Sequence, residues 1–219
     1  MTIDAEAFET LRSEALSSTV PWAGHQTFAQ VASWAVWAEE RGPDTSWSRD
    51  PGILTWDRLR PRIHARVVFV ALNMGTTRVG QTAADWANFH TGRADYKLAR
   101  AIGRPGTREE LEGAYITDFF KGLPTPTAAA LRAHLRGLDV RARAETTTAM
   151  VALLERELAI LQRPDPLLVG IGRDAERWLR AGMPTYDIVG ITHYAHAVAR
   201  DAYAEQLAAV ADLARRRTA

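Results

Sequence analysis

The stretch Arg66-Val-Val-Phe-Val-Ala-Leu-Asn73 decides the fold class. Residues 67–72 are all apolar and rich in β-branched Val, which is typical of a strand buried on both faces. Continuous apolar strands of this kind belong to parallel sheets, whose two faces are covered by helices. The run ends at a polar residue, Asn73, where we expect the strand to give way to a loop.

Three further short apolar runs follow, and helical patterns alternate with them. The runs cover residues 114–117, 166–171 and 186–191, and helical spacing covers 127–137, 148–162, 173–181 and 201–217. This alternation predicts an α/β fold: a single-domain three-layer sandwich with a central, mostly parallel four-stranded sheet flanked by helices. There is no internal repeat or linker, so residues 1–219 are expected to form one domain.

The N-terminal 60 residues are expected to form a helical and loop segment packed on that domain. A first helical segment opens the chain, and a second is predicted from apolar residues that share one helix face: Phe28, Val31, Trp34, Ala35 and Ala38. Residues 41–56 are rich in turn-forming residues but contain Trp47 and Trp56. We expect an ordered loop there, because these Trp side chains need a surface that buries them.

The composition excludes several classes of protein. The chain has no cysteine, so disulfides, thiolate zinc sites and cysteine-bound iron–sulfur clusters are excluded. No apolar run approaches the length of a membrane span, and we expect no membrane contact. These features fit a cytoplasmic protein. The net charge of +1 argues neither for nor against nucleic acid, and of 27 basic residues only Lys97 and Lys121 are Lys.

Polar and aromatic side chains gather after the predicted strands. Ligands of parallel α/β sheets bind outside the carboxyl ends of the strands. The residues that follow these ends include Asn73, Trp86, Phe89, Asp118, His193, Tyr194 and His196. The sequence therefore predicts that the functional site lies at this edge of the sheet.

Four short motifs occupy successive strand ends. Ala71-Leu-Asn-Met-Gly75 is similar to a G-x-N-P-G motif, and Ala114-Tyr-Ile-Thr-Asp-Phe-Phe-Lys121 to a Y-I-T-N-V-V-K strand. Residues 153–172 resemble a helix and third strand, and Ile191-Thr-His-Tyr-Ala195 falls where H-P-S is expected. In this order and spacing, residues 67–203 resemble the uracil-DNA glycosylase superfamily. The chain departs from that pattern at Met74, Asp118, Tyr194 and Ala195.

The resemblance implies roles for the residues at the matching positions. Asn73 would hold a water against C1′ of the sugar through its side-chain carbonyl. His193 would donate a hydrogen bond to O2 of the departing base, with His196 as the alternative donor. Tyr194 and His196 would contact DNA, and Tyr194 or Val198 would hold the flipped state or else pack in the protein. Phe89 would stack on the flipped base, with Trp86 as the competitor, and one of these two is expected to pack in the core.

Asp118 replaces the Asn that reads uracil in the resembling family. An ionised carboxylate only accepts hydrogen bonds, so it would face uracil O4 unfavourably. A protonated Asp118 would instead donate to cytosine N3 while accepting from the N4 amino group. Burial would favour this protonated form. Because removal of normal cytosine would damage the host genome, we expect a modified cytosine, such as one in foreign phage DNA, which would imply antiviral defence.

The sequence thus predicts a monofunctional DNA glycosylase that uses neither cofactor nor metal and has DNA as its only inferred partner. A lyase step is not expected, because no lysine stands out as a Schiff-base nucleophile. A uracil or hypoxanthine glycosylase and a non-catalytic DNA-binding module on the same fold remain the alternatives. Two rival patterns stay open: a His193–His196 metal site completed by His90 or Asp118, and a dinucleotide fingerprint, Gly170-Ile-Gly-Arg-Asp-Ala175.

Overall fold

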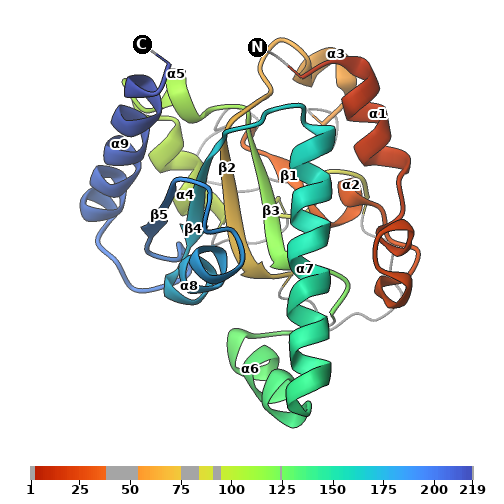
Figure 1. Cartoon of the computed structure of the whole chain (residues 1–219). Coiled ribbons are helices and arrows are strands. Elements are labelled where there is room, and N and C mark those ends of the chain that lie inside the picture. Colours follow the sequence, from red (N-terminus) through yellow and green to blue (C-terminus); the bar gives the residue numbers. More distant parts are fainter. Residues whose placement is uncertain (1–2, 38–53, 75–83, 91–94, 124, 219) are drawn as a thin grey trace.

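The computed structural model describes residues 3–37, 54–74, 84–90, 95–123 and 125–218. It confirms the predicted α/β class, with a mostly parallel sheet between two layers of helices (Figure 1). The strand order is β1-β3-β2-β4-β5; β1 is antiparallel to β3 and the other neighbours are parallel. The bounds are β1 Ser33–Trp34, β2 His64–Asn73, β3 Ala114–Phe120, β4 Leu167–Ile171 and β5 Ile188–Ile191.

The sheet has five strands, one more than the four predicted, because residues expected in a helix form the edge strand β1. Helix α2 (Phe28–Val31) lasts a single turn, and the chain is extended at Ala32. The Ser33 hydroxyl then donates to the carbonyl of Trp86 over 2.6 Å. Trp34 is fully buried, so its apolar spacing reflects burial on all sides of an extended segment. Ala38 and residues 41–53 of the predicted loop lie outside the described residues.

One face of the sheet is covered by helices that share a hydrophobic cluster with Val68, Val70 and Leu168. The long helix α7 runs from the far end of the strands toward α6, which lies beyond the strand tips (Figure 1). These helices are α1 Ala5–Ser13, α2, α6 Ala128–Gly137, α7 Val140–Ile160 and α8 Arg173–Gly182. Short helical turns of the N-terminal segment join them: Leu16–Ser18, Pro21–Ala23 and α3 Trp56–Leu59.

The opposite face carries α4 (Asp95–Ile102), α5 (Arg108–Leu111) and α9 (Arg200–Arg216). Their apolar residues form a second cluster with Val67, Phe69 and Ala71 of β2. The alternation of Val67–Leu72 between the two clusters is what a strand buried on both faces requires. Among the described residues, no helix has the length and apolar content needed to cross a membrane.

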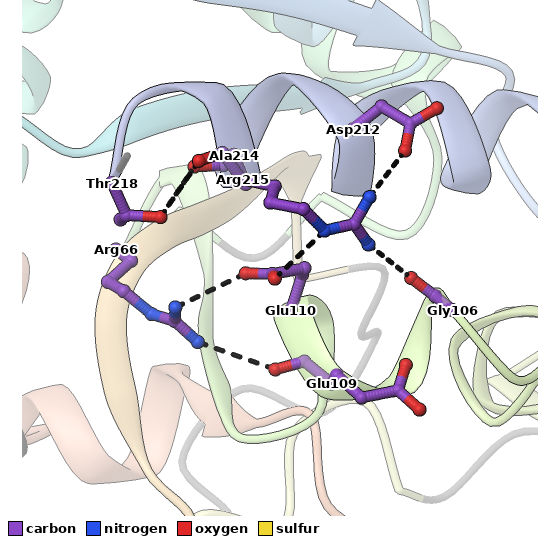
Figure 2. A network of polar contacts seen from close by, with 8 residues as sticks. All are labelled: Arg66, Gly106, Glu109, Glu110, Asp212, Ala214, Arg215 and Thr218. Atoms are coloured by element: carbon purple, nitrogen blue, oxygen red, sulfur yellow. Dashed lines mark hydrogen bonds and ion pairs between the residues drawn. The ribbon is translucent and has the colours of Figure 1, made fainter.

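Ion pairs fix the C-terminal half of α9 against α5 and β2 (Figure 2). The Glu110 carboxylate of α5 meets Arg66 of β2 at 3.2 Å and Arg215 of α9 at 3.4 Å. Arg215 also donates to the carbonyl of Gly106 at 3.0 Å. One carboxylate on a short helix therefore links the sheet to α9.

The glycines of the fingerprint-like stretch are explained by contact between β4 and α8. A Cβ on Gly170 would lie 2.7 Å from the backbone of Glu176 in α8. Gly172 has a φ of 96° and is the N-cap of α8. Close packing and a left-handed cap thus account for both glycines through contacts within the protein.

We predict that Gly170→Ala lowers the free energy of unfolding by about 1–3 kcal/mol, because its methyl group meets backbone that cannot move aside alone. Chemical denaturation of the purified variant measures this loss. The matched control is Gly137→Ala at the end of α6, where nothing lies within 4 Å of the added Cβ. The control should be neutral or slightly stabilising. Equal stabilities of the two variants would contradict the close β4–α8 contact.

Candidate functional site

A pocket of about 910 Å³ opens at the carboxyl ends of β2, β4 and β5. Its walls are the ends of β2 and β4, the first turns of α6 and α8, and the loop after β5. Asn73, His193 and His196 all line this strand-end pocket. Residues singled out from two distant parts of the sequence, the end of β2 and the loop after β5, therefore meet in one cavity.

Asn73 is held in one orientation by the segment that precedes α6. Its Nδ2 donates to the Thr125 carbonyl at 2.5 Å and to the Thr125 hydroxyl at 3.0 Å. Both amide protons are therefore engaged, and Oδ1 is the side-chain atom left to accept from a water. An amide fixed in this way can position a water but cannot act as a strong base.

The tautomer of His193 is set by its own loop. The backbone N–H of Ala195 donates to His193 Nδ1 over 3.1 Å, so Nδ1 acts as an acceptor. In the neutral ring the proton then resides on Nε2. Burial, followed by the neighbouring His196, lowers the pKa of His193 below its ordinary value, which favours the neutral form. His193 is thus arranged as a neutral Nε2–H donor beside the pocket.

Tyr194 packs within the protein, and His196 is exposed. The Tyr194 ring packs against His193 in a tilted arrangement with centroids 4.5 Å apart, whereas His196 meets His193 edge-on at 5.9 Å. The Tyr194 hydroxyl hydrogen-bonds to Asp95, and its pKa is raised well above the usual value by burial and by the nearby carboxyls of Asp95 and Asp118. In this conformation Tyr194 therefore supports the ring of His193 from within.

Asp118 lies in β3 just below the pocket edge and does not line the pocket. It pairs in register with Ala71, two residues before Asn73, which corresponds to a depth of about 7 Å along the strand. Its side chain is 1% exposed. Asn88 donates to Oδ2 over 2.9 Å, and Oδ1 has no hydrogen-bonding partner among the described residues.

Burial raises the pKa of Asp118 to about 7, against the opposing effects of the Asn88 hydrogen bond and the nearby Lys121 charge. The carboxyl is therefore poised between its two protonation states at neutral pH. Because Asn88 donates to Oδ2, the proton of the neutral acid belongs on Oδ1. Oδ1 then becomes a buried donor for which the described part of the chain offers no acceptor.

A fully buried ion pair supports the same strand end from the opposite face of the sheet. Lys121 Nζ lies 2.7 Å from Glu157 Oε2 of α7 and donates to the Asp118 carbonyl at 2.5 Å. Glu157 Oε1 accepts from the hydroxyls of Tyr115 and Thr117, each at 2.9 Å. Burial raises the pKa of Glu157, and Lys121 acts in the opposite direction. These contacts hold the backbone of Asp118 in place.

The two aromatic candidates lie in different clusters. Trp86 is 1% exposed and packs against Phe8 and Trp34, with ring centroids 4.9 and 5.4 Å away, so it is a core residue. Phe89 is 7% exposed and belongs to the cluster that contains Ala71 and Tyr194. Its backbone has a φ of 66°, a conformation that is uncommon for an aromatic residue. Phe89 is thus the aromatic candidate that shares a cluster with Tyr194, which follows His193.

Sequence reasoning missed the residues that orient the candidates. Asn88 also donates to the Val31 carbonyl at 2.8 Å, which fixes its amide toward Asp118. The Thr125 contacts with Asn73 span 52 positions in the chain. Asn88 and Thr125 are polar residues next to predicted strand-end loops. This position was the only feature of the sequence that could have suggested a role in the site.

Within the described part of the chain, no group of three or more His, Cys, Asp or Glu side chains is arranged to hold a metal ion. His90 lies in the core with Nε2 3.3 Å from the carbonyl of Trp34. No protein-family model matches the chain, and no curated protein matches it. The resemblance described above therefore rests on the strand-end motifs.

We predict that Asp118→Asn changes the pH dependence of stability. Asn accepts the Asn88 hydrogen bond but carries no charge. A folded-state pKa of about 7 lies above the unfolded value of about 3.9, so the wild type loses stability relative to the variant as pH rises between these values. The difference should grow by up to about 1.4 kcal/mol per pH unit and level off above about pH 7. The free energy of unfolding of both proteins is measured by chemical denaturation from about pH 4 to about pH 8. A difference between them that stays constant over this range would contradict the raised pKa.

Proposed function

We propose that this protein is a monofunctional DNA glycosylase that removes a cytosine-type base, a modified cytosine of foreign DNA. The observation that carries the proposal is the pairing in one pocket of an oriented amide, Asn73, with a neutral histidine donor, His193. Hydrolysis of an N-glycosidic bond needs these two functions, a held water and a stabilised leaving group.

The attack on the sugar is assigned to a water held by Asn73. As the C1′–N1 bond breaks, its electron pair goes to the base and positive charge builds on the sugar. Asn73 Oδ1 accepts from the water, whose oxygen then bonds to C1′, and the proton released ends on the departing base. Because the sugar is already electron-poor, holding the water in line contributes more than deprotonating it.

Stabilisation of the departing base is assigned to His193. Negative charge gathers on O2 of the base, and a preorganised Nε2–H donor there contributes a few kcal/mol to the barrier reduction. A neutral imidazole suits this role because it donates a hydrogen bond without first having to be protonated. The Ala195–Nδ1 contact favours His193 over His196 as the donor.

Recognition of the base is assigned to Asp118. In its neutral form, Oδ1–H donates to cytosine N3, and Oδ2 has a second lone pair for the N4 amino group beside the Asn88 contact. The proton shared with N3 also makes cytosine a better leaving group. Because Asp118 is covered in this conformation, the proposal requires neighbouring side chains to move when DNA binds.

We predict release of a cytosine-type base and an abasic product from a panel of oligonucleotides. The panel carries cytosine, enlarged 5-substituted cytosines, uracil and hypoxanthine in the same context, and single-turnover rates are measured. Asn73→Ala should lower the rate about a hundredfold or more, because the water loses its position. His134→Ala, an exposed change on α6, serves as the control and should keep the wild-type rate. Binding without release of any base would favour the non-catalytic module.

We predict that Asp118→Asn shifts the preference from cytosine-type bases toward uracil. An amide turned with its NH2 at the Oδ2 position donates to O4 and accepts from N3–H. The neutral acid, whose proton is held on Oδ1, instead presents a donor to N3–H and an acceptor to O4. A discrimination of about 1–3 kcal/mol corresponds to a roughly 5- to 150-fold change in the ratio of rates. The ratio is measured on paired oligonucleotides. Robust uracil release by the wild type without cytosine-type release would instead identify a conventional uracil glycosylase.

A further inference from the structure

A second pocket, of about 730 Å³, lies between α4 and α9 on the other side of the loop after β5. Ala195 lines both this pocket and the strand-end pocket, so the loop is a wall shared by the two. Tyr194 contributes the wall on this side, and His193 and His196 line the other. We call the second cavity the α4–α9 groove.

The groove is strongly basic. Among the described residues that line it, four are cationic and one, Asp201, is acidic; the cations are Lys97, Arg100, Arg104 and Arg200. Asp201 is paired with Arg104 at 2.7 Å, whereas Arg200 forms no ion pair with any described residue. For a chain whose net charge is +1, this is a marked local concentration of positive charge. A cavity of this character suits a ligand that carries several negative charges.

The start of α9 adds to the positive potential. Its N-cap is Ala199, which offers no side-chain acceptor to the first backbone N–H groups of this 17-residue helix. Arg200 occupies the first helical position, where a cation is unfavourable beside the positive end of the helix dipole. An anion bound there would meet both the exposed N–H groups and the guanidinium. The placement of Arg200 is locally costly in the free protein and favourable with an anion bound.

The groove is also joined to the loop that carries His193. Lys97 of α4 donates to the carbonyl of His196 at 2.8 Å, and the Thr192 N–H donates to Gln206 of α9 at 2.7 Å. Arg100 lies over the ring of Tyr96 with its Cζ 4.6 Å from the centroid, which orders one of the cations before any ligand arrives. The helices that carry the cations therefore also anchor the loop that borders the candidate catalytic pocket.

We propose that the α4–α9 groove binds backbone phosphates of the DNA strand whose nucleotide enters the strand-end pocket. The identification of the polymer as DNA rests on the proposed function, and the phosphate chemistry rests on the groove itself. A strand with one nucleotide in the first pocket can continue past Ala195, which lines both cavities, to the cations of the groove. Phosphates contacted in this way fix the register of a strand and carry no base specificity.

The test measures the salt dependence of binding to a short single-stranded oligothymidylate, which holds no base that the proposed reaction cleaves. Arg200→Gln should weaken binding and lower the slope of log K against log salt by about 0.7, the value for one lost phosphate contact on a single strand. The double variant Arg104→Gln/Arg200→Gln should lower it by about 1.4. Melting temperatures close to that of the wild type show that the variants are folded.

The matched control is Arg216→Gln. It removes the same charge from the opposite end of the same helix, about 24 Å away, and should leave the slope unchanged. Equal slopes for Arg200→Gln, Arg216→Gln and the wild type would overturn the proposal. So would displacement of the oligonucleotide by low concentrations of inorganic phosphate or thymidine 5′-monophosphate, which would identify a site for a free phosphate compound.

The outcome is independent of whether any base is cleaved. Loss of the salt-dependent contact in Arg200→Gln together with no base release from the oligonucleotide panel would uphold the groove and reject the glycosylase. Base release with an unaltered slope would reject the groove and uphold the glycosylase.

Discussion

The buried ion pair between Lys121 and Glu157 ties helix α7 to the strand end on which the candidate site depends. Both side chains are inaccessible to solvent. Removing one member of such a pair leaves an uncompensated buried charge, at a cost of about 3–5 kcal/mol. Lys121 also donates to the Asp118 carbonyl, and Glu157 also accepts from Tyr115 and Thr117. Contacts on the α7 face of the sheet therefore fix the end of β3, and the Asp118 side chain projects from that fixed backbone on the opposite face.

This arrangement explains how Asp118 comes to have a pKa of about 7. Burial alone would push the proton affinity of the carboxyl higher, and the Asn88 hydrogen bond and the Lys121 charge act against it. The Lys121 charge is in turn shared with Glu157 at 2.7 Å, which limits its effect on Asp118. The three ionisable groups thus determine together whether the carboxyl can act as a donor. A group with a pKa near neutrality can hold or release its proton at little cost.

The sequence predicted the main strands and helices because their patterns are local. The apolar run at 67–72 and the helical stripe of α7 need no knowledge of distant partners. It failed at β1, where a helical spacing around Trp34 belongs to an extended segment. The structure that forms there depends on pairing with Ile116 and Tyr115 and on a hydrogen bond to Trp86, none of which is encoded nearby. A wholly buried segment shows no polar face from which its period can be read.

The sequence likewise predicted some features of the candidate site and missed others. That Asn73 and His193 meet in one pocket followed from the rule that parallel strands end at one edge. The depth of Asp118 below that pocket did not follow, because it depends on the register of β3 against β2. The partners that orient each side chain, Thr125 and Asn88, lie far away in the sequence and could be found only in the fold.

The loop after β5 brings two opposite electrostatic requirements side by side. On the pocket side, burial and His196 favour a neutral His193, while on the groove side Lys97 and Arg200 gather positive charge. The loop separates them: Lys97 places its ammonium on the His196 carbonyl, and Gln206 holds the Thr192 N–H. Both anchors come from α4 and α9, the helices that form the groove. A phosphate bound between these helices would therefore contact the same two helices that anchor the loop carrying His193.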